Sequence, residues 1–156
     1  MDEKLNDKII PEGKVELIFR NVKTGIEDRY LVNNLVTSAG KASMADGLRG
    51  TTASNKGIIT YCALGTDLTA PEVTDTVLGA EIFRKLVSVR SVSGNVALFE
   101  TFFSIEEANG ELKEAGLFGD SATSTADSGT LFCHLAISRT KTSSDTLTLR
   151  WSVSIG

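Results

Sequence analysis

The stretch Glu106–Gly119, EEANGELKEAGLFG, carries the strongest local signal for the fold of this chain. Asn109 followed by Gly110 is typical of a two-residue type I′ turn, in which both central residues need a positive φ angle. The flanking residues 96–105 and 112–118 are rich in aromatic and aliphatic side chains, as strands are. The sequence therefore predicts a β-hairpin here, which we place in the middle of a β-sheet.

Further segments either alternate apolar and polar residues or are continuously apolar, and both patterns are typical of strands. They are residues 14–19, 26–32, 57–65, 80–92, 130–139 and 146–155. In the last of these the apolar residues from Leu147 to Ile155, Trp151 among them, occupy every second position, so one face of this strand should lie in the core. Turns at 21–25, 94–95 and 140–145 predict that consecutive strands pair as hairpins.

One segment has a different period. Small and apolar residues recur every three or four positions over residues 36–48, which indicates one face of a helix. Thr37 or Ser38 can cap its start, and Gly50 occupies the position where a glycine commonly ends a helix. Because the face is made of small residues, we expect the helix to lie close against a sheet.

The order of these segments predicts the fold class. Strands that follow one another at short spacing, without crossover helices, favour a mainly β protein. We predict an antiparallel β-sandwich of about seven or eight strands with one short helix. The 156 residues suit one domain, at 14–156, preceded by an extended and mostly polar N-terminal arm at 1–13. We expect this arm to dock on a neighbouring subunit.

Composition narrows the classes of partner. Hydrophobic residues make up 41% and charged residues 23% of the chain, which is ordinary for a globular protein. The 16 basic residues are scattered and outnumbered by 20 acidic ones, so we expect no nucleic-acid partner, because phosphate backbones require clustered Lys and Arg. No apolar run approaches the roughly 18 residues of a spanning helix, and no apolar signal segment begins the chain. We therefore expect no membrane partner, and a cytosolic chain unless a larger particle carries it out.

The residues that usually perform chemistry are few. His134 is the only histidine and is out of phase with the apolar residues of its strand, which predicts a half-exposed side chain without a catalytic role. Cys62 and Cys133 each lie in an apolar run, which favours two buried reduced thiols over a disulfide or a metal pair. No glycine-rich phosphate-binding motif occurs, so no cofactor is predicted.

Two groups of acidic residues are candidate sites. Asp67, Glu72 and Asp75 share one loop and suggest calcium, but their spacing matches no EF-hand, so a solvated acidic loop is favoured and calcium stays open. A second group surrounds the predicted hairpin and suggests a glycosidase pair, although nearby Lys113 and the turn favour a solvated tip. This group is Glu106, Glu107, Glu111 and Glu114. We predict no catalytic, cofactor-binding or metal-binding residue, and no enzyme.

Two segments carry a family resemblance. Cys62–Pro71 with Asp75–Arg84 resembles the pattern LGTG-x-TAP-x-x-DT-x-L-x-x-E-x-x-R of tailed-bacteriophage structural proteins, which include tail and tail-fibre proteins. Ala108–Phe118 resembles the ANG-x-(I/L)-x-E-(A/V)-GLF segment of the same family. With weaker similarity at Leu131 and Phe132 and in the closing strand, the resemblance covers about residues 30–155. Asp67 departs from it, because the family usually has glycine there.

The resemblance implies a virion component, assembled in the host cytoplasm, that packs with copies of itself and with other virion proteins. The leading expectation is a subunit of an oligomeric tail, neck or fibre-attachment assembly. The alternatives are a capsid decoration protein or head fibre, and a host-surface carbohydrate-binding module, for which Trp151, Tyr30 and Tyr61 are the only candidate aromatic platforms.

The motif residues are expected to support the scaffold. Gly65 and Pro71 would shape a loop, and Leu78 would plug the end of the sandwich. Glu81 and Arg84 are spaced for a structural ion pair or an intersubunit contact. Glu114 would pair with a base such as Arg84.

Overall fold

The computed structural model describes residues 11–50 and 56–156, and within these ranges the chain is mainly β and antiparallel, as predicted. It contains nine strands and one helix in those ranges, slightly more strands than the seven or eight expected. The elements are β1 Glu12–Asn21, β2 Glu27–Val36, α1 Ser38–Arg49, β3 Ile59–Gly65, β4 Glu81–Leu86, β5 Val89–Ser93, β6 Val96–Phe103, β7 Gly110–Gly119, β8 Thr130–Lys141 and β9 Asp145–Ser154.

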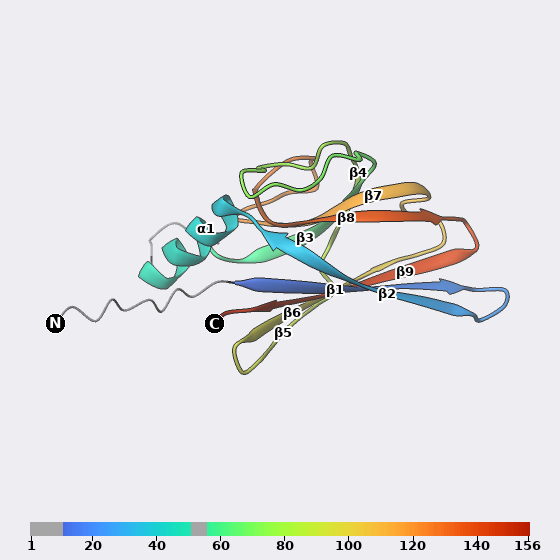
Figure 1. Ribbon diagram of the computed structural model, residues 1–156, viewed down its shortest axis with the longest axis horizontal. Helices are drawn as coiled ribbons and strands as arrows, with labels where there is room; N and C mark the ends of the chain where they lie inside the picture. Colours follow the sequence, from blue (N-terminus) through green and yellow to red (C-terminus); the bar gives the residue numbers. More distant parts are fainter. Residues whose placement is uncertain (1–10, 51–55) are drawn as a thin grey trace.

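The strands form one curled sheet in the order β4-β3-β7-β8-β2-β1-β9-β6-β5. β2 bends between two halves: most of it pairs with β1, whereas its last two residues, Leu35 and Val36, pair with β8. The halves lie over one another (Figure 1). We call β4, β3, β7 and β8 the loop-covered layer, because the loops at 66–80 and 120–129 lie on its outer face, and β1, β9, β6 and β5 the open layer.

The predicted strand at 80–92 is divided between the two layers. β4 pairs with β3 in the loop-covered layer, and β5 pairs with β6 in the open layer. At the crossing, the Val87 amide donates to the Thr60 carbonyl in the loop-covered layer, and the next amide, of Ser88, donates to the Glu100 carbonyl in the open layer. The chain therefore joins the layers at both sides of the curl, through β2 and through residues 87–88.

Two of the predicted hairpins are confirmed. β1 pairs with β2 across the 21–25 turn, where Gly25 has a φ of 72°. β5 pairs with β6 across Gly94, which has a φ of 60°. In both turns glycine occupies the left-handed region, where other residues are strained.

The hairpin predicted around Asn109 and Gly110 is wrong. β6 and β7 do not pair: β6 lies between β9 and β5, and β7 lies between β3 and β8. The loop at 104–109 carries the chain from one layer to the other, and the positive φ angles belong to Ala108, at 52°, and Gly110, at 131°, and not to Asn109 between them. The Asn109 amide is used differently, since it donates to the Ile105 carbonyl, 2.8 Å away.

The last predicted hairpin is wrong for the same reason. β8 pairs with β7 and β2, whereas β9 pairs with β1 and β6. The turn between them closes through a bond from the Asp145 amide to the Thr142 carbonyl, but it connects the two layers. Short connections were correctly identified, but a short connection between layers has the same polar composition as one between paired strands.

The helix agrees with its prediction to within two residues. The Thr37 hydroxyl accepts the Gly40 amide, 2.9 Å away, as an N-cap, and Gly50 ends the helix with a left-handed φ of 67°. A Cβ on Gly40 would lie 2.7 Å from the Cα of Phe132 on β8. The small face therefore lets α1 contact the backbone of the sheet, as expected.

Alternating residues of the two layers fill the core between them. Leu147, Leu149, Trp151 and Val153 of β9 are at most 2% exposed, which confirms the predicted phase of this strand. Opposite them lie buried residues of β3, β7 and β8, and Phe83 of β4 packs edge-on against Phe103 of β6, with ring centroids 5.9 Å apart. Burying such side chains is the main favourable term in folding.

The end of the predicted N-terminal arm belongs to the sheet. β1 already includes Glu12 and Gly13, which pair with Ser154 and Val153 of β9. Residues 1–10, and with them the expected docking on a neighbour, lie outside the described residues.

Candidate functional site

Glu114 of β7 and His134 of β8 form the centre of a buried polar cluster on the outer face of the loop-covered layer. They are 1% and 4% exposed. Nε2 of His134 lies 2.9 Å from Oε2 of Glu114, and Nδ1 lies 2.7 Å from Oδ2 of Asp75, in the 66–80 loop. The cluster therefore joins two neighbouring strands to the loop that covers them.

The Glu114 carboxylate also holds the ends of this loop. It accepts the backbone amides of Asp67 at 3.3 Å, Gly79 at 3.0 Å and Ala80 at 2.7 Å. A Cβ on Gly65 would collide with the same carboxylate, so the glycine provides the space that Glu114 occupies. One side chain thus accepts three backbone amides at the two ends of the loop.

The hydrogen bonds around His134 limit what it can do chemically. An ionised carboxylate only accepts hydrogen bonds, so both ring nitrogens have to donate, which is the pattern of a cationic imidazole. Each ring nitrogen is occupied by a carboxylate oxygen, Nδ1 by Asp75 and Nε2 by Glu114. Neither nitrogen is free to take a proton from a substrate, as a general base must. The geometry suits a structural clasp.

Two predictions about these residues are wrong. His134 was expected to be half-exposed and is buried. Its phase was correctly identified, since it points away from the core, but the 66–80 loop covers that face. Glu114 was expected to pair with a base such as Arg84 and pairs with His134 instead. Leu78, expected at the end of the sandwich, belongs to this loop itself and packs onto Phe118 and Leu131 on the outer face.

The acidic residues of the 66–80 loop line a hollow of about 410 Å³ beside His134. Asp75 accepts the Glu72 amide at 2.8 Å, and Asp67 accepts the amide and the hydroxyl of Thr69. These Thr69 bonds lower the pKa of Asp67. Their carboxylates therefore order the loop itself. In the described parts of the chain, no set of three or more His, Cys, Asp or Glu side chains is arranged to hold a metal ion.

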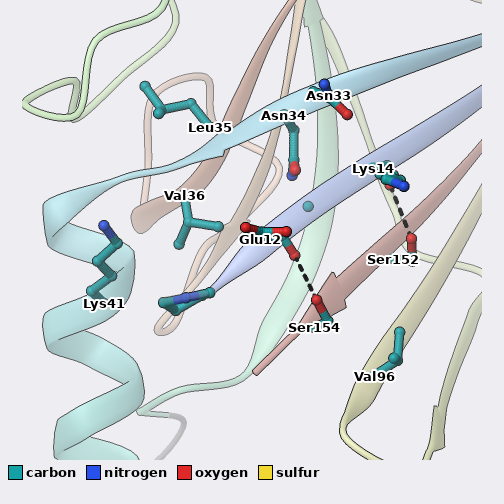
Figure 2. Close-up of a pocket in the computed structure, with 12 residues that line it drawn as sticks. Glu12, Lys14, Asn33, Asn34, Leu35, Val36, Lys41, Val96, Ser152 and Ser154 are labelled. Atoms are coloured by element: carbon teal, nitrogen blue, oxygen red, sulfur yellow. Dashed lines mark hydrogen bonds between the residues drawn. The ribbon is translucent and has the colours of Figure 1, made fainter. Parts of the chain in front are cut away.

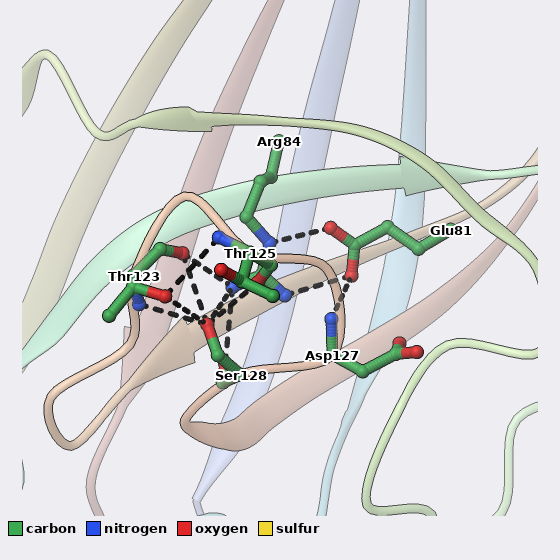
Figure 3. A network of polar contacts seen from close by, with 6 residues as sticks. All are labelled: Glu81, Arg84, Thr123, Thr125, Asp127 and Ser128. Carbon is green, nitrogen blue, oxygen red and sulfur yellow. Dashed lines mark hydrogen bonds and ion pairs between the residues drawn. The ribbon is translucent and has the colours of Figure 1, made fainter.

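A second buried network, around Arg84, holds the 120–129 loop (Figure 3). Arg84 forms a bidentate ion pair with Glu81, with distances of 2.5 and 2.8 Å, and both side chains are almost fully buried. Its Nη1 donates to the carbonyls of Thr123 and Ser128, and Glu81 accepts the Asp127 amide at 3.1 Å. The predicted Glu81–Arg84 ion pair is present within the chain, and it fastens the loop onto β4.

The guanidinium of Arg84 also packs on an aromatic face. Its central carbon lies 4.5 Å from the centroid of the Phe118 ring and 5.7 Å from that of Tyr61. Such a planar cation can stack and form forked hydrogen bonds simultaneously, which lysine cannot do.

The glutamates that suggested a glycosidase pair each make a different contact. Glu107 pairs with Lys85 at 2.7 Å, Glu111 lies 3.7 Å from Lys113, and Glu114 is the clasp described above. Burial alone would raise the pKa of Glu107, but its bonds to Lys85 and to the Ser104 amide outweigh that effect and lower it. Glu107 therefore stays ionised, unlike a general acid.

Sequence analysis missed a buried lysine. Lys141, at the end of β8, is 1% exposed, and its Nζ donates to the Ser104 carbonyl at 2.7 Å and to Oδ1 of Asn109 at 2.8 Å. Burial lowers its pKa, and the charges of Asp145 and Glu107 partly offset that effect. Lys141 fixes the 104–109 crossover. A lysine at a strand end is ordinarily solvated, so nothing in the sequence pattern indicates this role.

The two cysteines are buried free thiols, as predicted. Cys62 of β3 and Cys133 of β8 lie opposite the same residue, Leu117 of the intervening strand β7. Two strand spacings, or about 10 Å, therefore separate the two cysteines. That exceeds the distance a disulfide can span. Burial raises the pKa of each thiol to about 12.

A larger hollow, of about 710 Å³, lies where β1 begins (Figure 2). Glu12, Lys14, Asn33 and Lys41 contribute its polar lining, and the hydroxyls of Ser152 and Ser154 face the carbonyls of β1. These groups mainly complete the strand pairing, and within residues 11–50 and 56–156 the charged side chains of this hollow form no ion pair with one another.

Comparisons with protein-family models, with curated proteins and with solved structures gave no match. Among the described residues, the only helix is α1, which is 12 residues long and too short to cross a membrane.

Proposed function

We propose that this chain is a non-enzymatic structural subunit of a tailed-phage virion, packed into an oligomeric tail, neck or fibre-attachment assembly. The proposal starts from the resemblance of Cys62–Arg84 and Ala108–Phe118 to phage structural proteins. The structure adds a physical role for the residues that carry this resemblance.

One observation carries the proposal: the charged residues of the motifs are consumed by contacts inside the chain. Glu114 clamps the 66–80 loop and His134, and Glu81 with Arg84 clamps the 120–129 loop. A catalytic acid or base needs a hydrogen-bonding position that is free to contact the substrate. The hydrogen-bonding positions of these side chains are occupied by contacts within the chain. This favours a scaffold that holds two loops in place.

The open layer offers room for neighbouring subunits. On its outer face Leu98 and Phe102 of β6 are 37% and 43% exposed, and Leu31 of the adjoining strand β2 is 70% exposed. They surround a row of alternating charges formed by Arg29, Glu16, Arg150 and Glu100. Apolar side chains within a charged surface are common where proteins meet.

The carbohydrate-binding alternative needs an exposed aromatic side chain, and Trp151 is not exposed. Trp151 is 1% exposed, and Tyr30 and Tyr61 are only partly exposed, with Tyr30 stacked under Arg139 at 3.6 Å. The decoration or head-fibre alternative keeps the same scaffold and differs in location on the particle.

Electron microscopy of virions tests the proposal. Antibodies raised against the recombinant chain should label particles from a host culture that produces it, at the tail or neck. Labelling over the whole capsid would favour the decoration protein, and quantitative gels of the same particles would then give hundreds of copies in place of tens. Protein that stays in the lysate and is absent from purified particles would refute both.

A further inference from the structure

The edge strand β5 is unusually open. All five of its residues, from Val89 to Ser93, are exposed, with Val92 at 75%. It pairs with β6 on one side, and no other described strand lies along its second side. An edge of this kind presents unpaired amides and carbonyls, which are a template for another strand.

Three protections that often guard a sheet edge, namely proline, lysine and a β-bulge, are missing from β5. Its five residues contain no proline and no lysine, and its register with β6 is regular from Val89 to Ser93. Its one charge, Arg90, turns away from the edge, since its Nη1 reaches the Ile59 carbonyl on β3, 3.3 Å away. The opposite edge, β4, differs: its pairing with β3 contains an irregularity at Gly65, and its charged side chains bind the adjacent loops.

The sequence of β5 is compatible with a second copy of itself. In an antiparallel pair centred on Ser91, Val89 lies opposite Ser93 and Arg90 lies opposite Val92, so no like charges meet. Val89 and Ser91 share the outer face with Leu98 of β6, and these residues line a small, mainly apolar depression. The pairing would therefore add apolar contact to the backbone hydrogen bonds.

We propose that two copies of this chain associate through antiparallel pairing of their β5 edges, about a two-fold axis at Ser91. The two curled sheets then become continuous. A five-residue edge is small compared with stable interfaces, so the contact is weak in isolation and gains strength where many copies are held together. This inference concerns the isolated chain and does not depend on the proposed virion role.

Charge variants at the axis test this register. In a Ser91→Lys dimer two lysines would face each other, and in a Ser91→Glu dimer two glutamates would, so each variant should remain monomeric. An equimolar mixture should associate, because opposite charges then meet. Leu48→Lys, at a residue of α1 that is 91% exposed, is the matched control for adding a surface lysine.

Sedimentation equilibrium of the full-length chain is the measurement, up to a concentration on the order of 1 mM, where weak interfaces become populated. The wild type and the Leu48→Lys variant should rise from the monomer mass of 16.6 kDa toward twice that value. Amide exchange at 89–93 should slow over the same range.

A wild type that stays monomeric, or variants that associate as well as it does, would overturn the proposal. A mixture of the two Ser91 variants that stays monomeric would exclude the register. Circular dichroism melts of each variant check that it is folded. None of these outcomes would change the labelling of virions, so the two proposals can fail separately.

Discussion

At the scale of residues, the buried polar groups of the loop-covered layer matter most. Glu114 and His134 lie where the sequence predicts a solvent-facing side of a strand, and they are tolerated there because each polar atom has a partner. Breaking a buried ion pair from one side leaves a charge without compensation, which costs more than removing both charges.

We expect His134→Gln to lower the free energy of unfolding by about 3 kcal/mol, because the buried Glu114 side chain loses the ring nitrogen that contacts it at 2.9 Å. Asp75→Asn should cost less, since the Asp75 side chain is 28% exposed and water can replace part of the contact. The Glu114→Gln, His134→Gln double variant should recover part of the loss. Urea unfolding at pH 7 measures all of these, and strictly additive costs would contradict the coupling.

Thr101 of β6 provides the opposite case. It is fully buried, and its hydroxyl finds no hydrogen-bond partner among the described residues apart from the weakly polar Cys62 thiol nearby. Thr101→Val keeps the shape and removes an unsatisfied polar atom. We expect it to raise the free energy of unfolding by up to about 1 kcal/mol, measured by urea unfolding, with Thr148→Val on the outer face of β9 as the control. A loss of stability would indicate that the hydroxyl is satisfied.

At the scale of elements, patterns along the chain predicted where strands, helix and turns lie better than they predicted which strands pair. The phase of β9, the caps of α1 and the turns at Gly25 and Gly94 follow from local rules, and each is confirmed. Pairing partners depend on which layer a strand enters. The polar turns before β7 and β9 contain nothing that distinguishes a crossover from a hairpin, so both were assigned wrongly.

The site was hidden for a related reason. The role of His134 depends on a loop that begins more than 50 residues earlier in the chain and folds over it. Its partner Glu114 was assigned to the wrong base, Arg84, because neither the spacing nor the strand pattern indicates which basic residue lies beside it. The Glu81–Arg84 pair was predictable because both partners lie on one short strand.

The local stability of the whole 120–129 loop should depend on the contacts of Arg84. Arg84→Lys keeps the charge but loses the forked contacts to Glu81 and to the carbonyls of Thr123 and Ser128. We expect amide exchange in the loop to become at least about tenfold faster, a loss of local stability of about 1.4 kcal/mol or more, while β7 and β9 keep their protection. Arg29→Lys is the control, because Arg29 is 53% exposed and such pairs contribute little. Unchanged exchange in the loop would contradict the clamp.

At the scale of the whole molecule, stability should fall in acid. The pKa values of Asp67, Glu107, Asp120 and Asp145 are all lowered in the folded chain. A carboxyl whose pKa is lower when folded contributes stability above its unfolded pKa, near 4, and that contribution disappears as the pH falls through the folded value. Melting temperatures should therefore be level near neutral pH and decline below about pH 5.

Asp120 offers a direct check of this cause. Burial alone would raise its pKa, but hydrogen bonds from Ser43, Thr130 and the Gly57 amide, together with the charge of Lys56, outweigh burial and lower it. Asp120→Asn tolerates the positive φ of 53° at this position and cannot titrate. The variant should melt lower than the wild type at pH 7, and the difference should shrink toward pH 2. A difference that is constant with pH would assign the effect to something other than charge.

The crossing between the layers at residues 87–88 has a consequence for how the chain folds. Each layer is assembled from pieces that are scattered along the sequence, so neither can form ahead of the other from a contiguous length of chain. Contacts between distant residues dominate such a topology and slow folding. A fragment ending at Gly94 would contain strands of both layers and complete neither. We expect it to remain unfolded, with the full chain unfolding in a single cooperative step.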